Sequence, residues 1–211
     1  MDDHNANISR TLKKVFLDAG DRVPEGLDRL SGYVAELLLW NRRFHLTGMK
    51  TVEEIAEKGV YACARIADHL AGCRSVLDIG SGNGLPGLVL AALVPSSTMT
   101  LVEKSPVKAS FLKTAAAKMD TGNVAVVTAR AEEMVGSLAA DAAMSMAVLR
   151  PAAWLELGRN FVEPGGRVLL LHAGRDPVPD DAANLDLVTT DVYTLPWSGH
   201  SRAISVYKKN S

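Results

Sequence analysis

A glycine-rich run at residues 78–87, with the sequence DIGSGNGLPG, is the segment of this chain best suited to bind a ligand. It follows a short apolar stretch at residues 75–79, which is typical of a buried strand, and it precedes an apolar stretch of helical character. Glycines at such a turn allow tight backbone bends and let a ligand approach the main chain closely. Because open α/β sheets bind ligands where their strands end, the run predicts a nucleoside or nucleotide site.

A carboxylate follows at the end of the next predicted strand. Residues 98–102 form a second apolar stretch, and Glu103 comes directly after it, about 20 residues beyond the glycines. A carboxylate in this place can accept hydrogen bonds from both hydroxyls of a ribose. The order and the spacing therefore favour a nucleoside ligand over a glycine turn with an unrelated surface glutamate.

Two classes of nucleoside ligand fit this pattern. Residues 82–87 match G-x-G-x-x-G, which is typical of dinucleotide binding and would make the chain a nicotinamide-dependent oxidoreductase. Residues 78–84 also match D-x-G-x-G-x-G, which suits S-adenosylmethionine because Asp78 offers an oxygen to a cationic cofactor. A hairpin predicted at the C-terminus fits a methyltransferase sheet better than two mononucleotide-binding halves. These features together favour the methyltransferase.

The elements that would position these residues begin with helices. Apolar residues repeat at helical spacing in three segments, which begin near Ile8, after Pro24 and at Thr51. Residues 51–54 fit a capping box, in which a threonine and a glutamate satisfy the first backbone N–H groups of a helix. None of the three segments carries a strand signal, so we expect an N-terminal helical cap over residues 1–73.

Five short strands then alternate with helices, which is typical of a parallel sheet covered on both faces. Two further strands, at residues 185–192 and 203–207, flank a turn at residues 196–199 and predict an antiparallel hairpin. Over residues 74–211 we therefore expect the Rossmann-like α/β fold of class I S-adenosylmethionine-dependent methyltransferases, with a seven-stranded sheet.

The composition excludes several other classes of protein. The 211 residues contain 23 Lys and Arg against 24 Asp and Glu, a formal net charge of -1, so the chain is not a polybasic binder. Two cysteines are too few for a disulfide framework or a four-cysteine zinc site. The first residues are polar and acidic, and the longest uncharged run is broken by glycines and prolines. We therefore expect a cytoplasmic protein that neither carries a signal peptide nor enters a membrane.

Two segments together resemble a known family. Residues 40–47, WNRRFHLT, and residues 78–87 are similar to the paired motifs of the bacterial glucose-inhibited division protein B family, the small-subunit 16S ribosomal RNA guanine-N7 methyltransferases. The Gly-Leu-Pro-Gly ending of the second segment is more specific than its glycines alone. The resemblance extends to about residue 175 and includes Phe111-Leu112 and residues 131–133. It implies S-adenosylmethionine as cofactor, ribosomal RNA or the small ribosomal subunit as partner, and a monomer.

The resemblance also implies roles for individual residues. Gly80 and Leu85 would line the methionine and ribose portions of the cofactor, Glu103 would hold the ribose, and Ala131 with Glu132 would lie beside the adenine. The residues expected at the cofactor are Asp78, Gly80, Ser81, Gly82, Gly84, Leu85, Glu103, Lys104, Ala131, Glu132, Ser145 and Met146.

The acceptor side departs from the family pattern. Residues 145–147 are SMA where the family has Ser-Arg-Ala, and residues 172–174 are HAG where it has Leu-Lys-Gly. Arg150 and His172 are therefore the acceptor-side, catalytic candidates. The departures leave open a related methyltransferase with another acceptor, or a non-catalytic RNA-binding member of the family.

Methyl transfer to guanine N7 suits a site without a catalytic dyad or a metal. N7 carries a lone pair and no proton, so the reaction needs in-line positioning and no general base. Carboxylates that could bind a metal are scattered around predicted turns, at Asp141, Asp176, Asp180 and Asp181. An RNA acceptor needs positive charge near the cleft, for which the candidates are Lys13, Lys14, Arg42, Arg43, Lys50, Lys58, Lys104, Lys108, Lys113 and Lys118.

Overall fold

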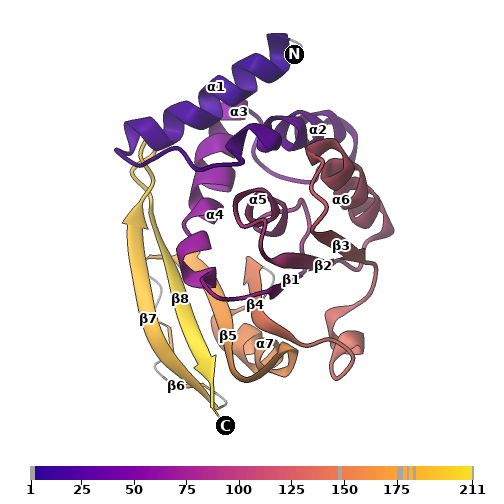
Figure 1. The fold of residues 1–211 in the computed structure, drawn as a ribbon, viewed down its shortest axis with the longest axis vertical. Helices are drawn as coiled ribbons and strands as arrows, with labels where there is room; N and C mark the ends of the chain where they lie inside the picture. Colours follow the sequence, from indigo (N-terminus) through magenta and orange to yellow (C-terminus); the bar gives the residue numbers. More distant parts are fainter. Residues whose placement is uncertain (1–2, 147–148, 175–177, 180, 183, 211) are drawn as a thin grey trace.

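One mixed sheet forms the centre of the molecule (Figure 1). The computed structural model describes residues 3–146, 149–174, 178–179, 181–182 and 184–210. The strand order is β3-β2-β1-β4-β5-β8-β7-β6; the first five strands along the chain pair in parallel and the last three join antiparallel. The strands are β1 (Ser75–Ile79), β2 (Thr98–Val102), β3 (Val124–Val127), β4 (Ala140–Met146), β5 (Val162–Ala173), β6 (Asp181–Ala182), β7 (Leu185–Thr194) and β8 (Ser201–Lys209).

The predicted α/β fold with a terminal hairpin is confirmed, with two differences in the sheet. The two-residue strand β6 pairs with β7 and adds an eighth strand to the seven expected. The turn predicted at Gly165-Gly166 lies inside β5, where the register against β4 shifts and Gly165 has a φ of 84°. The strand therefore starts before this bulge, whereas the apolar run that predicted it starts only at Val168.

Helices precede the sheet and connect its strands. The helical cap contains all three predicted segments, but the third is divided into α3, a π-helical segment η2, α4 and a 3₁₀ turn η3. The helical elements are α1 (Asp3–Asp18), η1 (Leu27–Arg29), α2 (Leu30–Phe44), α3 (Val52–Glu54), η2 (Ile55–Tyr61), α4 (Ala62–Ala64), η3 (Ala67–Leu70), α5 (Gly87–Leu93), α6 (Pro106–Met119), η4 (Ala131–Met134), α7 (Pro151–Gly158) and η5 (Arg159–Phe161).

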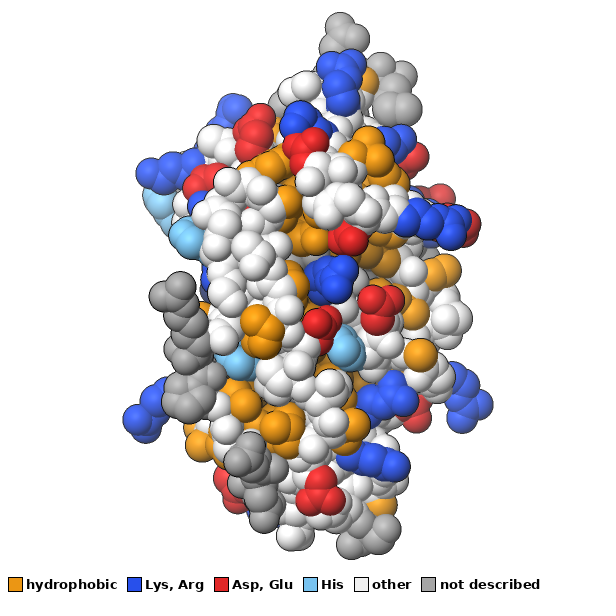
Figure 2. All heavy atoms as spheres, turned by 90° about the vertical axis from the view of Figure 1, so that its left-hand side faces the viewer, with side chains coloured by type: hydrophobic (Ala, Val, Ile, Leu, Met, Phe, Trp, Pro, Cys, Tyr) orange, Lys and Arg blue, Asp and Glu red, His pale blue; other side chains and the backbone are white. Residues whose placement is uncertain are grey.

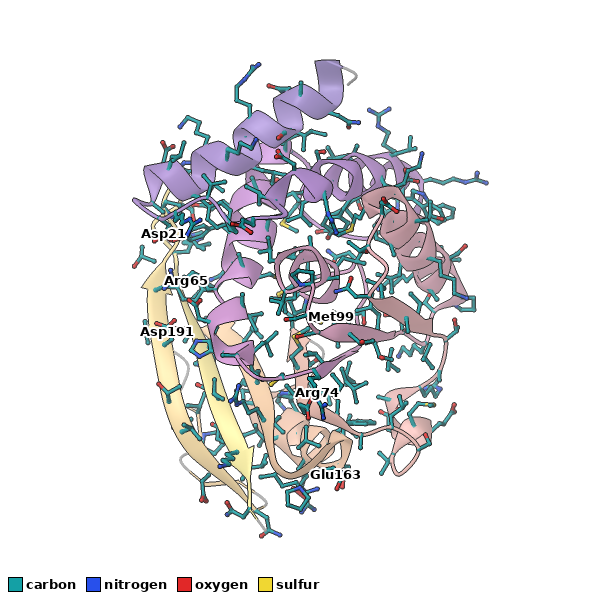
Figure 3. The ribbon with its side chains drawn as sticks, in the orientation of Figure 1. Asp21, Arg65, Arg74, Met99, Glu163 and Asp191 are labelled. Carbon is teal, nitrogen blue, oxygen red and sulfur yellow. The ribbon has the colours of Figure 1, made fainter. Side chains whose placement is uncertain are left out.

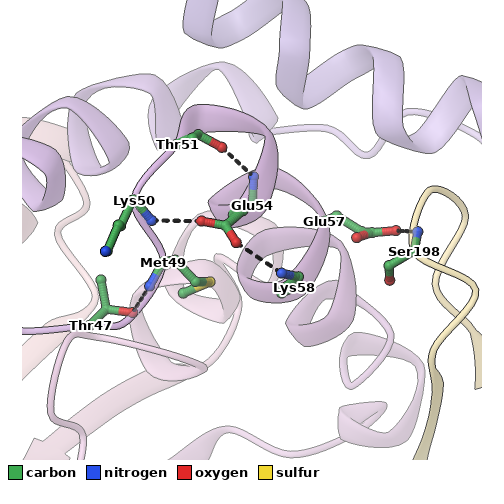
Figure 4. Close-up of polar contacts among 8 residues, drawn as sticks. All are labelled: Thr47, Met49, Lys50, Thr51, Glu54, Glu57, Lys58 and Ser198. Carbon is green, nitrogen blue, oxygen red and sulfur yellow. Dashed lines mark hydrogen bonds and ion pairs between the residues drawn. The ribbon is translucent and has the colours of Figure 1, made fainter.

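The capping box at Thr51 forms with one change of partner (Figure 4). The Thr51 hydroxyl accepts a hydrogen bond from the Glu54 N–H at 3.2 Å, as a capping box requires. The Glu54 carboxylate reaches back to the N–H of Lys50, at 2.8 Å, instead of that of Thr51. The helix start is satisfied, and the same carboxylate also pairs with Lys58 at 3.0 Å.

The two faces of the sheet are covered by different helices. One hydrophobic cluster joins the helical cap, α5 and α6 to β1 and β2, through buried residues such as Leu12, Leu37 and Leu101. The other contains Trp154, Leu155 and Phe161, from α7 and η5, packed under the opposite face. Because the first cluster contains residues from both sides of position 74, the cap shares its core with the sheet. The division into two domains at residues 73 and 74 stays a prediction.

The tip of the β7–β8 hairpin is fastened to the cap (Figure 4). The buried Glu57 carboxylate, on η2, accepts hydrogen bonds from the backbone N–H groups of Trp197 at 2.5 Å and Ser198 at 2.6 Å. The Trp197 indole donates to Asp18 at 2.8 Å, and Lys14 lies over its ring. These contacts at the hairpin tip, which we name the clasp, therefore connect the β7–β8 hairpin to α1 and η2.

A Glu57→Ala substitution should lower the free energy of unfolding by about 2 kcal/mol, because two N–H groups lose a charged acceptor in a partly buried place. Chemical denaturation measures the effect. Glu53→Ala, at an exposed position one turn earlier, is the control and should change stability by less than about 0.5 kcal/mol. Equal stabilities of the two variants would contradict this role of the clasp.

A second polar contact joins β7 to the cap (Figure 3). Arg65 lies between Asp21, at 3.3 Å, and Asp191, at 3.9 Å. On the side of the molecule that carries this contact, basic and acidic side chains are interspersed (Figure 2). Among the described helices, none combines the length and the apolar character needed to cross a membrane.

Candidate cofactor site

The glycine run forms a loop at the carboxyl end of β1, which lies between β2 and β4 in the sheet. The N–H groups of Gly80 and Ser81 both donate to the carbonyl of Val102, at 2.8 and 3.1 Å, and so tie the loop to the end of β2. Gly80, Gly82 and Gly84 have φ values of 74°, 54° and 90°. Residues that carry a Cβ are strained in this left-handed region of backbone conformation, so these three positions require glycine.

Glu103 joins the loop to the start of α6. Its Oε2 accepts a hydrogen bond from the N–H of Gly82 at 2.9 Å, and its Oε1 accepts one from the N–H of Ser105 at 2.8 Å. The residue is 6% exposed. A carboxylate has about four acceptor positions, so two remain for other donors. Glu103 is thus held in one orientation by the main chain and keeps the capacity to accept two ribose hydroxyls.

Asp78 lies beneath the loop. Its Oδ2 accepts the N–H of Gly87 at 3.0 Å, while its Oδ1 is buried without a hydrogen-bond partner among the described residues. Burial raises the pKa of this carboxyl to about 7, against the opposing effect of the Gly87 N–H. At 1% exposure it holds the far end of the loop in place, whereas the sequence suggested that it would offer an oxygen to the cofactor.

A cavity of about 290 Å³ opens beside the loop and Glu103. This volume is close to the lower end of the range of about 300–1,000 Å³ that small-molecule sites occupy. Seven of the twelve residues predicted at the cofactor line it: Gly80, Gly82, Glu103, Lys104, Ala131, Glu132 and Ser145. These residues come from the ends of β1, β2 and β4 and from η4, so the fold brings together four segments that are distant in sequence.

The other five predicted cofactor residues are not on the wall of the cavity. Besides Asp78, they are Ser81, Gly84, Leu85 and Met146. The Ser81 hydroxyl donates to the Asp78 carbonyl at 2.8 Å, and a Cβ on Gly84 would lie 2.5 Å from Leu88 Cδ1. Leu85 is buried against the π-helical segment η2, where it approaches Gly59. Ser81, Gly84 and Leu85 therefore pack behind the loop, away from the cavity.

Neither acceptor-side candidate lines the cavity. Arg150 is exposed at the N-terminus of α7, directly after Leu149, which lines the cavity. His172 is on β5, where its Nε2 lies 3.0 Å from the Ser205 hydroxyl of β8. His172 does not line the cavity. Ala147, of the segment that departs from the family pattern, lies outside the described residues.

Several lining residues were not singled out for the cofactor by the sequence. Lys108 and Arg130 contribute cations to the wall, and Trp154 and Leu157 contribute its apolar floor. Trp154 is 1% exposed, and its indole donates to the Leu169 carbonyl at 2.9 Å. The signal that could have revealed Lys108 is its place one turn after Ser105, the residue that caps α6.

Metal-binding carboxylates are not gathered anywhere in the part of the chain that the structure describes. Asp141 accepts the N–H groups of Arg74 and Ser75 where β1 begins, at the edge of the sheet opposite to the cavity. Asp176 and Asp180 lie outside the described residues.

Comparison with known proteins decides between the two possible ligands. The profile of a family described as rRNA small subunit methyltransferase G matches residues 27–185. The chain belongs to this family. It is 34% identical to the ribosomal RNA small subunit methyltransferase G of Myxococcus xanthus (strain DK1622), over 86% of this chain and 87% of the relative. The like-named protein of Anaeromyxobacter dehalogenans (strain 2CP-C) is 37% identical over 85% and 87% of the two chains.

Solved structures support the same fold. The O-methyltransferase from Bacillus cereus, in complex with SAH, superposes with a TM-score of 0.60 at 16% identity, over 84% of this chain and 90% of that one. The O-methyltransferase TomG from Streptomyces achromogenes, in complex with SAM, has a TM-score of 0.58 at 16% identity, over 85% and 90%. This chain is an S-adenosylmethionine-dependent methyltransferase of class I fold, and the nicotinamide-dependent alternative is set aside.

The residues around the cavity fit S-adenosylmethionine. The ribose would be held by Glu103, whose two free acceptor positions match two hydroxyl donors. The left-handed glycines leave the main chain of residues 80–82 open to close approach.

Proposed function

We propose that this protein transfers a methyl group from S-adenosylmethionine to N7 of a guanine in small-subunit ribosomal RNA. The observation that carries the proposal is the glycine loop joined to Glu103 beside the cavity, in a chain of this family. Guanine N7 is the acceptor that the family resemblance implies, and because N7 gives up no proton, its methylation needs no general base. We further propose that the protein is a cytoplasmic monomer and uses no metal.

The residues of this chain act by binding and orientation. When bound, S-adenosylmethionine supplies an electrophilic methyl group on its sulfonium. Glu103 would accept the ribose hydroxyls, and Ala131 with Glu132, which line the cavity at η4, would lie beside the adenine. Trp154 and Leu157 line the cavity with apolar surface and exclude water from it. The Ser145 hydroxyl donates to the Ile79 carbonyl at 2.9 Å and so holds the ends of β1 and β4 side by side. Catalysis then comes from alignment of N7 with the methyl group.

The acceptor can be tested directly by tritium transfer. Labelled S-adenosylmethionine is incubated with the protein and with unmodified small ribosomal subunits, naked small-subunit RNA or protein. We expect label in the RNA, recovered as 7-methylguanine after hydrolysis. Label in another nucleotide or in protein would replace guanine N7 by a different acceptor. Binding of the cofactor without any methyl transfer would indicate that the protein is a non-catalytic, RNA-binding member of the family.

A Glu103→Ala substitution should weaken S-adenosylmethionine binding by roughly 1–3 kcal/mol, because the ribose hydroxyls lose their acceptor. The Gly82 N–H also loses the oxygen that fixes the loop. Calorimetric titration measures the affinity. Glu133→Ala is the control, because this exposed glutamate does not line the cavity. Unchanged affinity of the Glu103 variant would remove this residue from the site.

A further inference from the structure

Ion pairs sort the cations that the sequence offered for RNA binding. Lys13, Lys14 and Lys58 pair with Asp28, Asp18 and Glu54. The remaining seven form no ion pair with any described residue: Arg42, Arg43, Lys50, Lys104, Lys108, Lys113 and Lys118. These seven are the cations available to an external anion.

Helices α2 and α6 bring some of these cations together. The Trp40 and Phe111 rings meet at 5.7 Å, near the end of α2 and the start of α6. At the other ends of the two helices, a Cβ on Gly32 would lie 3.2 Å from the Lys118 carbonyl. The helices are therefore antiparallel neighbours. The C-terminal turn of α2 lies beside the N-terminal turn of α6, which carries Lys108.

The end of α2 presents an aromatic ring beside a guanidinium. Phe44 is 39% exposed, and its ring packs on Trp40 at 5.2 Å. The Arg43 guanidinium lies 5.4 Å from the centre of the Phe44 ring. Arg43 and Phe44 follow Trp40 by three and four positions, so they share its face of the helix, the face that meets α6. The Phe44 ring therefore contacts both Trp40 and the Arg43 guanidinium, and the residue remains partly exposed.

Lys104 and Lys108 continue this surface to the cavity. Both lysines line the wall of the cavity, as does the acidic residue Glu103. The Glu103 carboxylate is buried and engaged by two N–H groups, and the neighbouring Glu36 accepts the Trp40 indole at 2.7 Å. Neither acid pairs with the exposed cations. The adenosine part of S-adenosylmethionine carries no phosphate, so it offers these lysines no anionic partner.

We propose that Arg43, Phe44, Lys104 and Lys108, which we name the α2–α6 ridge, bind a single-stranded segment of the RNA acceptor at the edge of the cavity formed by the end of β2 and the start of α6. The cations contact phosphates, and the Phe44 ring stacks on an unpaired base. Proteins recognise single-stranded RNA by this combination of an aromatic platform and a positive track. The inference rests on the proposed function and adds to it where the RNA strand enters the site.

The test measures RNA affinity against salt concentration, without cofactor, with a labelled single-stranded RNA of 20 nucleotides and with deproteinised small-subunit RNA. The logarithm of RNA affinity falls as the logarithm of salt concentration rises, and each phosphate contact on a single strand contributes about 0.7 to the steepness of this fall. An Arg43→Gln/Lys108→Gln variant should therefore make the slope less steep by about 1.4. The control is Lys113→Gln/Lys118→Gln, in which two cations of α6 away from the ridge are removed. An equal slope in ridge variant and wild type would overturn the proposal.

Phe44→Ala tests the stacking contact. We expect RNA affinity to fall by about tenfold or more, as for other base–aromatic contacts, while calorimetric affinity for S-adenosylmethionine stays unchanged. Leu17→Ala, at an exposed apolar position of α1, is the control for loss of surface area. A Phe44 variant that binds RNA like the wild type would overturn the stacking role.

Failure of the proposed function gives a different result. It shows as absent methyl transfer to any RNA by the wild type, measured in the tritium assay. If the wild type transfers methyl groups to RNA and the ridge variants do so with unchanged RNA affinity, only the ridge is overturned.

Discussion

An Asp78→Asn variant should gain stability over the native protein as the pH rises, with a difference that reaches roughly 4 kcal/mol above neutral pH. The carboxyl is buried beneath the glycine loop, and burial raises its pKa to about 7 from a usual value of 3.8. Asparagine keeps an oxygen for the Gly87 N–H and carries no charge to desolvate.

The sign follows from proton binding. Below pH 4 the carboxyl is protonated in both the folded and the unfolded protein, so it contributes no pH dependence. Between about pH 4 and pH 7 the unfolded chain releases the proton and the folded protein keeps it. The free energy of unfolding of the native protein therefore falls over this interval and levels off above it. The variant lacks this decline.

Urea denaturation of both proteins without cofactor, at several values between pH 4 and pH 8, measures the difference. Asp141→Asn is the control, because the Arg74 and Ser75 N–H groups lower the pKa of that carboxyl below its usual value of 3.8. Asp141 is therefore ionised in both the folded and the unfolded protein above about pH 5, and its removal should lower stability by an amount that stays constant from there to pH 8. A constant difference between the Asp78 variant and the native protein would show that Asp78 is not the titrating group.

Gly87→Ala should destabilise the protein by about 3 kcal/mol, the upper part of the usual cost of overpacking a core. A Cβ on Gly87 would lie 2.2 Å from Leu101 Cδ2 and 2.6 Å from Asp78 Oδ2. Both neighbours are buried, at 0% and 1% exposure, so neither can move aside into solvent. The substitution would also displace the N–H that the Asp78 carboxylate accepts.

The control for this substitution is Gly122→Ala, in the turn between α6 and β3, because a Cβ there meets no atom within 4 Å. We expect it to change stability by less than about 0.5 kcal/mol. Thermal and urea denaturation compare the two variants. If Gly87→Ala is as mild as the control, the loop can shift away from Leu101 and the close packing is not essential.

Local patterns predicted the part of the site that local geometry builds. The glycines of residues 80–84 and Glu103 follow strands whose apolar runs are short and clear, so their place at the edge of the sheet could be deduced. Two of the three glycines line the cavity with Glu103, as expected. The strand-to-helix rhythm also predicted the parallel sheet and the terminal hairpin.

Contacts between distant segments could not be deduced in this way. The cofactor motif did not indicate Trp154, which reaches the cavity from α7 only once the sheet is formed, and Lys108 was expected near an RNA acceptor but not on the wall of this cavity. His172 lies at the end of β5, where its Nε2 is 3.0 Å from the Ser205 hydroxyl of β8, a contact between strands that local patterns do not reveal; its role at the acceptor stays a prediction. Asp78 was expected to face the cofactor, and a motif alone does not specify which side of the loop a carboxylate occupies.

The clasp at Trp197 has a consequence for the order in which the chain folds. The Trp197 indole and Asp18, which it contacts, are 179 residues apart in sequence. Forming so non-local a contact requires closure of almost the whole chain, which is slow compared with the pairing of neighbouring helices. During synthesis, α1 can pack on α2 early, but it cannot be fastened until the last hairpin leaves the ribosome. The contact between α1 and the β7–β8 turn can therefore form only after both segments have been synthesised.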